Sequence, residues 1–108
     1  MNQMISNDLV EGLLKIFPNY LISIILYGSV ARGDDTNESD VDIAIILENE
    51  PDSKSLDYLI ELSVDLDIKY NKVFSIIDID YKEFSKWQNT LPFYKNIKEE
   101  GVVLWTAA

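Results

Sequence analysis

The sequence predicts an α+β domain in which helices flank a β-sheet of at least three strands. Three apolar runs, at residues 20–27, 41–47 and 73–79, are rich in isoleucine, as buried strands often are. Around these runs, apolar residues recur every three or four positions, which is the spacing of amphipathic helices. The predicted order is helix, strand, strand, helix, strand, helices.

The first helix is predicted to begin at a cap formed by Ser6 or Asn7 and to end at Pro18 and Asn19. One side of this helix should cover a face of the sheet, because its apolar positions repeat at helical spacing. These positions are Leu9, Val10, Leu13, Leu14 and Phe17.

The middle of the chain predicts two strands and a second helix. Residues 20–27 (YLISIILY) are almost wholly apolar, as expected of a central strand buried on both faces, and Gly28 ends them. Residues 41–47 (VDIAIIL) have the same character and stop before Pro51. A helix over residues 53–70, with Ser53 as its cap, should then pack through an apolar face.

The C-terminal part predicts a third strand over residues 73–79, followed by a short helix from Tyr81. Thr90, Leu91 and Pro92 resemble a cap and a first-turn proline of another helix, which should end near Gly101. Residues 102–105 are an apolar tail that can add an edge strand. No repeat or linker interrupts residues 1–108, so we expect a single domain.

Composition excludes several classes of function. Nine basic and nineteen acidic residues give a net charge of -10, which opposes general binding to a nucleic-acid backbone. The absence of cysteine and histidine excludes disulfides, thiolate zinc sites and a Ser-His-Asp triad. The N-terminus has no signal-peptide pattern and no apolar run is long enough to span a bilayer, so we expect a cytoplasmic protein without a membrane partner.

Residues 28–45 (GSVARGDDTNESDVDIAI) hold the residues with the clearest chemical pattern. On a strand, Asp40 and Asp42 should point to the same face with their α-carbons about 6.6 Å apart, because each residue rises about 3.3 Å. Two carboxylates this close repel unless a cation lies between them. Their hard oxygen atoms suit Mg²⁺ or Mn²⁺, so the pair predicts a metal site.

Gly28 and Ser29 follow a strand and should open a short helical turn that ends near Arg32. Glycine lets the backbone approach a ligand closely, and the following amides and the serine hydroxyl can hold a triphosphate. Arg32 is a candidate phosphate contact or a surface arginine. Together with the acidic pair, this turn predicts a nucleotide site in which metal ions bridge phosphate oxygens.

A Walker phosphate loop is excluded by the same stretch. Gly28 and Gly33 have the four-residue separation of that loop. However, Asp34 and Asp35 stand where its lysine and its serine or threonine belong, and carboxylates cannot replace a phosphate-binding cation.

Gly28-Ser29, ten intervening residues and then Asp40-Val41-Asp42 resemble the GSx10DxD signature of the polymerase-beta-like nucleotidyltransferase superfamily, specifically its minimal nucleotidyltransferases. The resemblance extends to LDIKYNKVFSIIDID and PFYKNIKEEGVVL and so covers nearly the whole chain. It implies a small mixed sheet flanked by helices. It also implies that Gly28 and Ser29 contact the phosphates of a nucleoside triphosphate, and that Asp40 and Asp42 hold magnesium.

The family pattern also includes a third carboxylate on a later strand, as a metal ligand or as the base for the incoming hydroxyl. Phe74 and Ser75 stand where several relatives have this acid. The candidates in this chain are Asp78, Asp80 and Asp67, and a fourth alternative is that the third acid is missing.

Minimal nucleotidyltransferases are commonly paired with HEPN-domain ribonuclease toxins. The resemblance therefore implies an antitoxin that transfers AMP from ATP to a tyrosine of its HEPN toxin, in a hetero-oligomer. The alternative is an antitoxin that neutralises the toxin by binding alone, its acidic surface covering a basic ribonuclease. Transfer to a small molecule such as an aminoglycoside is disfavoured, because those enzymes usually carry a further domain.

Other conspicuous side chains have simpler explanations. We expect Asp34, Asp35 and Glu38 to belong to a solvated loop that Ser39 helps to orient. The aromatic residues of the C-terminal part should serve the core or a protein interface rather than base stacking. These residues are Trp87, Phe93, Tyr94 and Trp105.

Overall fold

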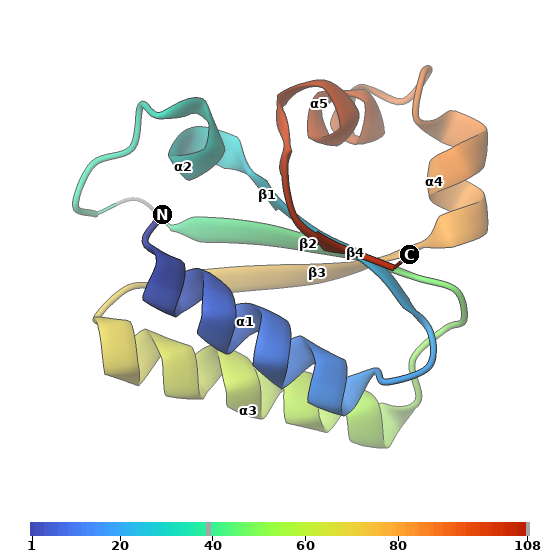
Figure 1. Cartoon of the computed structure of the whole chain (residues 1–108). Helices are drawn as coiled ribbons and strands as arrows, with labels where there is room; N and C mark the ends of the chain where they lie inside the picture. The colour runs from blue at the N-terminus through green and yellow to red at the C-terminus, as the bar shows by residue number, and fades with distance from the viewer. Residues whose placement is uncertain (39, 108) are drawn as a thin grey trace.

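A computed structural model describes residues 1–38 and 40–107 (Figure 1). Ser39, which the sequence predicts to orient its loop, lies outside these residues. The order of elements agrees with the sequence prediction, and the C-terminal tail forms a fourth strand. The elements are α1 (Gln3–Ile16), β1 (Leu21–Tyr27), α2 (Gly28–Arg32), β2 (Val41–Leu47), α3 (Ser53–Tyr70), β3 (Phe74–Asp80), α4 (Tyr81–Trp87), α5 (Pro92–Glu100) and β4 (Val102–Thr106).

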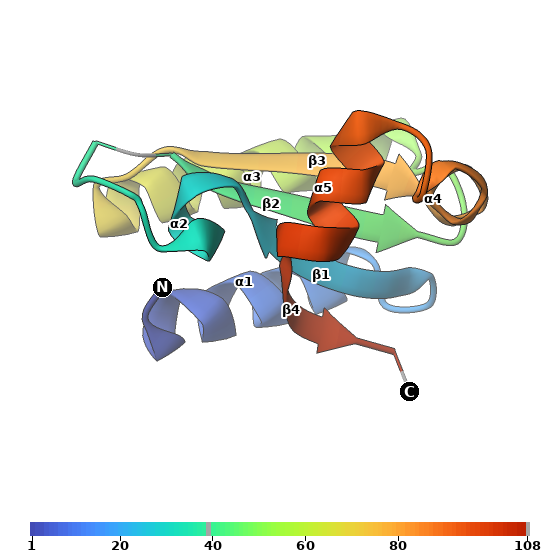
Figure 2. The same ribbon diagram turned by 90° about the horizontal axis from the view of Figure 1, so that it is seen from above.

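The four strands form one mixed sheet in the order β3-β2-β1-β4 (Figure 2). β1 runs antiparallel to both of its neighbours, β2 and β4, whereas β2 and β3 are parallel. The parallel pair is possible because the long helix α3 carries the chain back between the two strands. This arrangement confirms the predicted fold class, a small mixed sheet flanked by helices, and the predicted edge strand at the C-terminal end.

Helices cover both faces of the sheet (Figure 1). α1 and α3 pack on one face, where Leu9 and Leu13 belong to the same buried cluster as Ile43 and Ile45. α4 and α5 pack on the other face, where Ile97 belongs to a smaller buried cluster. Because side chains alternate along a strand, neighbouring residues of β2 contribute to opposite clusters.

Two helices begin at caps other than those predicted. α1 begins four residues earlier than Ser6 suggests, because the side chain of Asn2 accepts a hydrogen bond of 2.9 Å from the Ile5 amide. α3 is capped by Asp52, whose carboxylate accepts a bond of 2.7 Å from the Ser55 amide, and not by Ser53. In each case, an earlier residue of a suitable type already satisfies a free amide of the first turn.

A polar cluster ties α1 to α3. The Asp8 carboxylate accepts hydrogen bonds from Lys69, at 2.7 Å, and from the Tyr70 hydroxyl. These bonds lower the pKa of Asp8, and the bond from Lys69 has a larger effect than the bond from Tyr70. The two helices are therefore joined by charge as well as by apolar packing. In the described part of the chain, no helix has the length and hydrophobicity needed to cross a membrane.

Candidate active site

The candidate site is centred on Gly28 and Asp42, which lie at the same end of the sheet. Asp42 pairs with Tyr27 across the antiparallel strands β1 and β2, so Gly28 comes directly after its cross-strand neighbour. Gly28 has a φ of 75°, a backbone conformation that favours glycine. A Cβ atom added to Gly28 would overlap Oδ2 of Asp42 and lie 3.2 Å from its Cγ. The motif's glycine therefore makes room for the motif's carboxylate.

Asp42, the second acid of the motif, has a perturbed carboxyl. Burial raises the pKa of the Asp42 carboxyl, the charge of Asp40 raises it further, and Arg32 opposes the rise. Asp40 is exposed and directly precedes β2. The structure therefore places both acids of the motif and Arg32 within electrostatic reach of one another, with an unfavourable negative charge on the more buried acid.

Arg32 ends α2 and contacts two further acids. Its Nε lies 3.3 Å from Asp34 and its Nη1 lies 3.7 Å from Glu100, the last residue of α5. Its side chain is 45% exposed, so it remains accessible to an incoming anion. Ser29 is half-buried, and its carbonyl accepts bonds from the amides of Gly33 and Asp34 that close the turn.

Asp78 and Asp80 do not join Asp42. In the parallel pair of β2 and β3, Asp42 lies beside Ser75, whereas Asp78 pairs with Ile45 and Asp80 with Leu47. Asp78 is thus three residues, or about 10 Å, further along the strand. Since paired residues share a face of the sheet, both acids belong to the face opposite Asp42.

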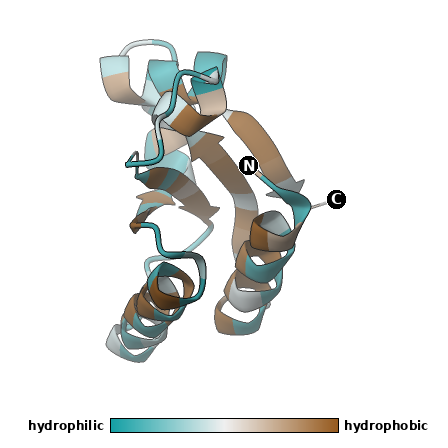
Figure 3. Cartoon of the chain, turned by 90° about the vertical axis from the view of Figure 1, so that its left-hand side faces the viewer, coloured by the Kyte–Doolittle hydropathy of each residue, from teal (hydrophilic) through white to brown (hydrophobic). Residues whose placement is uncertain are grey.

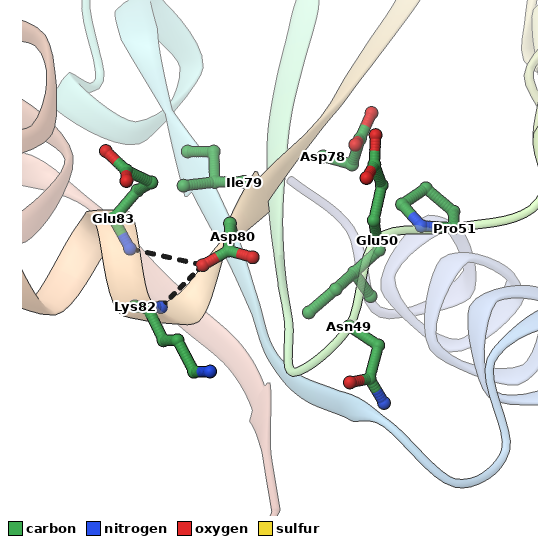
Figure 4. Close-up of a pocket in the computed structure, with 9 residues that line it drawn as sticks. Asn49, Glu50, Pro51, Asp78, Ile79, Asp80, Lys82 and Glu83 are labelled. Carbon is green, nitrogen blue, oxygen red and sulfur yellow. Dashed lines mark hydrogen bonds between the residues drawn. The ribbon is translucent and has the colours of Figure 1, made fainter.

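These two acids instead line a separate pocket of about 430 Å³ at the far end of β2 and β3 (Figure 4). Asp80 is the cap of α4, and its Oδ1 accepts bonds from the amides of Lys82, at 2.8 Å, and Glu83, at 3.2 Å. In Figure 4, the carboxylates of Asp78 and Glu50 lie on the same side of this pocket and are directed away from Asp80. Neither acid is placed to act at the Gly-Ser turn.

Asp67 also has a structural role. It lies on α3, and its Oδ1 accepts a hydrogen bond of 2.7 Å from the Phe74 amide at the start of β3. Over residues 1–38 and 40–107, no group of three or more acidic side chains is arranged to hold a metal ion. Of the alternatives for the third carboxylate, the described geometry therefore agrees with its absence, and Ser75 occupies the strand position beside Asp42.

The structure adds a pocket that sequence reasoning missed. A cavity of about 200 Å³ adjoins Gly28 and Arg32 and is closed on its other side by Phe93, Asn96 and Glu100 of α5. The Phe93 ring, 45% exposed, meets the ring of Tyr27 edge to face at 5.7 Å between centroids. The sequence has no signal for this pocket, because only the packing of α5 against β1 brings these residues to the turn.

The residues at this turn fit a divalent cation held jointly with a nucleotide. Mg²⁺ in proteins is usually held by one or two carboxylates, with the remaining ligands from phosphate oxygens and water. Asp40 and Asp42 supply two carboxylates beside a turn that glycine leaves open. A cation would also offset the like charges that raise the pKa of Asp42.

A mixed sheet with helices on both faces, and a Gly-Ser turn beside acids at the start of the next strand, defines the nucleotidyltransferase class of fold. Residues 11–107 match the family described as "Polymerase beta, Nucleotidyltransferase", and the chain belongs to this family. It is 38% identical, over 98 residues, to a "putative protein adenylyltransferase" of Methanocaldococcus jannaschii. That match covers 91% of this chain and 92% of the relative.

Several solved structures have a similar fold, including the following two. A crystal structure of a toxin-antitoxin with AMP-PNP matches with a TM-score of 0.64 and 21% identity, over 94% of this chain and 73% of that one. A structure of the tri-AMPylated HEPN toxin of Shewanella oneidensis in complex with MNT antitoxin matches with a TM-score of 0.63 and 20% identity. This second match covers 99% of this chain and 74% of the other. At these identities, the likeness shows the fold.

Proposed function

We propose that this chain is an antitoxin that transfers AMP from ATP to a tyrosine hydroxyl of a HEPN-domain ribonuclease, with Mg²⁺ held by Asp40 and Asp42. The observation that carries the proposal is the fit between Gly28 and Asp42, in which the motif's glycine leaves space for the motif's carboxylate. A relative that is 38% identical over 91% of the chain bears the name of a protein adenylyltransferase, which supports the reaction type. Structural neighbours that are complexes of an antitoxin with a HEPN toxin support the partner.

In the proposed reaction, the acceptor oxygen forms a bond to the α-phosphorus of ATP and the bond to pyrophosphate breaks. Asp40 and Asp42 would hold magnesium, which would supply positive charge to offset the negative charge that develops on the phosphate. Gly28 and Ser29 position the triphosphate, and Arg32 turns from its exposed contact with Glu100 toward a phosphate. The acceptor's proton passes to solvent or to a group of the toxin, because Ser75 and not an acid lies beside Asp42.

The alternative function, neutralisation by binding alone, is favoured by one observation. The three candidate third acids all lie away from Asp42: Asp67 and Asp80 accept backbone hydrogen bonds, and Asp78 faces a different pocket. A chain with a net charge of -10 can still bind a basic ribonuclease through its surface. The two functions therefore differ in whether the two acids of the motif are needed.

The test uses purified chain, a candidate HEPN-domain ribonuclease, Mg²⁺ and ATP labelled at the α-phosphate. We expect the natural chain to label the toxin and the double variant Asp40→Asn, Asp42→Asn to lose at least about 100-fold in rate, as removal of metal ligands does. EDTA should abolish labelling. Mass spectrometry should place the added AMP on a tyrosine.

The matched control is the double variant Asp35→Asn, Glu38→Gln, which removes two exposed acids of the same loop and the same amount of charge. This control should label the toxin at the natural rate and neutralise its ribonuclease activity. If the Asp40→Asn, Asp42→Asn variant neutralises the toxin fully, and the natural chain labels nothing, the antitoxin acts by binding alone.

A further inference from the structure

The outer side of α3 carries an exposed apolar ridge. Ile60, Val64 and Ile68 are 63%, 48% and 77% exposed, and Leu56 begins the same row at 36%. Residues four apart on a helix lie next to one another, so these side chains form one continuous row. Figure 3 shows brown, hydrophobic segments along α3 between teal, hydrophilic ones. The sheet is already covered by the opposite side of the helix, where Leu59 and Leu66 are buried.

An acidic row runs beside this ridge. Asp57, Glu61 and Asp65 also repeat every four residues. Each of them comes directly after a residue of the ridge in the sequence. Among the ion pairs found over residues 1–38 and 40–107, none uses these three acids. Of the nearby lysines, Lys69 pairs with Asp8. Lys15 and Lys54 line the groove between α1 and α3 together with Glu61 and Asp65, but neither is among the ion pairs found in the described residues.

We propose that this ridge and the acidic row beside it form a docking surface for an amphipathic helix of another protein, with an apolar stripe bordered by lysine or arginine. The apolar stripe would remove the exposed leucine, isoleucine and valine surface from water, which stabilises a complex. The basic border would face the acidic row, so that charge sets the orientation and the choice of partner.

A second copy of this chain packed antiparallel does not meet these requirements. Two antiparallel α3 helices packed ridge to ridge about a two-fold axis would bring their acidic rows to the same side of the interface. Like charges at an interface oppose association, and each chain already carries a net charge of -10. The charge pattern therefore requires a partner of the opposite sign.

This docking surface does not depend on the proposed transfer reaction. α3 covers one face of the sheet, whereas Asp42 shares the other face with Tyr27 and α5 (Figure 1). A partner can therefore occupy the ridge while the Gly-Ser turn remains open. Failure of AMP transfer would leave this inference intact, and the reverse also holds.

The test uses two synthetic 18-residue helical peptides with the same leucine stripe, one bordered by lysine and the other by glutamate. Binding to the natural chain is measured by fluorescence anisotropy at 0.15 M salt. The lysine-bordered peptide should bind at least tenfold more tightly than the glutamate-bordered one. The variant Ile60→Ser, Ile68→Ser should weaken its binding about tenfold, and Glu61→Gln, Asp65→Asn should reduce the difference between the two peptides.

The control variant Met4→Ser, Val103→Ser removes two apolar side chains that are 61% and 57% exposed and lie outside α3. It should bind the lysine-bordered peptide as the natural chain does, and circular dichroism should show that all variants are folded. The proposal is overturned if the natural chain binds neither peptide or both equally, or if the Ile60→Ser, Ile68→Ser variant binds unchanged. A dimer in sedimentation that this variant abolishes would also overturn it, since a second copy would then cover the ridge.

Discussion

Asp42 and Gly28 illustrate how two residues fourteen positions apart depend on each other. The carboxylate of Asp42 lies where a side chain on residue 28 would have to be, and glycine alone leaves that space. The same placement partly buries Asp42, which raises the pKa of its carboxyl. At this scale, the site keeps a charge in an unfavourable position that a bound cation would relieve.

Replacing Gly28 with alanine should abolish AMP transfer, because the new Cβ overlaps Asp42 and the residue must also keep a φ of 75°. Gly33→Ala is the matched control. Gly33 has a φ of 78°, but its added Cβ meets nothing within 4 Å, so this variant carries only the backbone strain of about 1–2 kcal/mol. Transfer assays and thermal unfolding of both variants distinguish the effect of the Cβ–Asp42 overlap from the effect of backbone strain. Equal loss of transfer in the two variants would contradict the role given to Gly28.

Asp42→Asn should raise the melting temperature of the metal-free chain at pH 7. An acid with a raised pKa in the folded state loses stability as pH rises from the ordinary aspartate value of 3.8 through the raised one. The advantage of the variant should therefore be largest above that range and vanish below about pH 3.8. Calorimetry in EDTA across this pH range measures it. If the variant is no more stable than the natural chain at pH 7, ionised Asp42 does not destabilise the metal-free fold.

Added Mg²⁺ and ATP should then reverse the order of stability. Binding to the folded state alone stabilises it, and the natural chain keeps both carboxylates that we propose as metal ligands. Its melting temperature should rise with ligand concentration, whereas that of Asp42→Asn should change little.

At the scale of elements, strand alternation decides which acids of β3 are available to the site. The parallel pairing with β2 sets Ser75 beside Asp42 and turns Asp78 and Asp80 to the other face. Asp80 then serves the next element, as the cap of α4. The last acid of β3 therefore caps a helix, and the face of β3 that Asp42 shares carries serine and isoleucine side chains.

Asp80→Ala should cost about 1 kcal/mol of stability, because it frees two amides of the first turn of α4. It should leave the rate of AMP transfer unchanged. Asp78→Ala removes a carboxylate from the same face of β3 without touching the cap, and should change stability by less than about 0.5 kcal/mol. Chemical denaturation and transfer assays measure both effects. A large loss of transfer in Asp80→Ala would restore this acid as a candidate for the third carboxylate.

At the scale of the whole molecule, the two helical layers have different tasks. The layer of α4 and α5 borders the candidate active site through the pocket at Phe93 and Asn96. The layer of α1 and α3 completes the larger core and carries the exposed ridge beside its acidic row. A negatively charged chain can therefore present a nucleotide site and a separate docking surface on opposite faces of one sheet.

Much of this molecule could be predicted from its sequence because the signals are local. Runs of isoleucine indicated β1, β2 and β3, helical spacing indicated α1 and α3, and Gly28-Ser29 with Asp40-x-Asp42 indicated the candidate site. The capping residues of the helices could not be predicted in the same way, because several neighbouring polar residues can satisfy the same free amides. Asn2 and Asp52 cap the helices that Ser6 or Asn7 and Ser53 were expected to cap.

The sequence by itself determined the elements, the fold class and the pair of acids, because periodicity and motif spacing depend on residues close together in the chain. Only the tertiary structure decided which acids lie near Asp42, that Phe93 and Asn96 line a pocket at Gly28, and that the apolar ridge of α3 remains exposed. The physical reason is strand register: a shift of one residue exchanges the two faces of a strand, and pairing with distant residues sets that register.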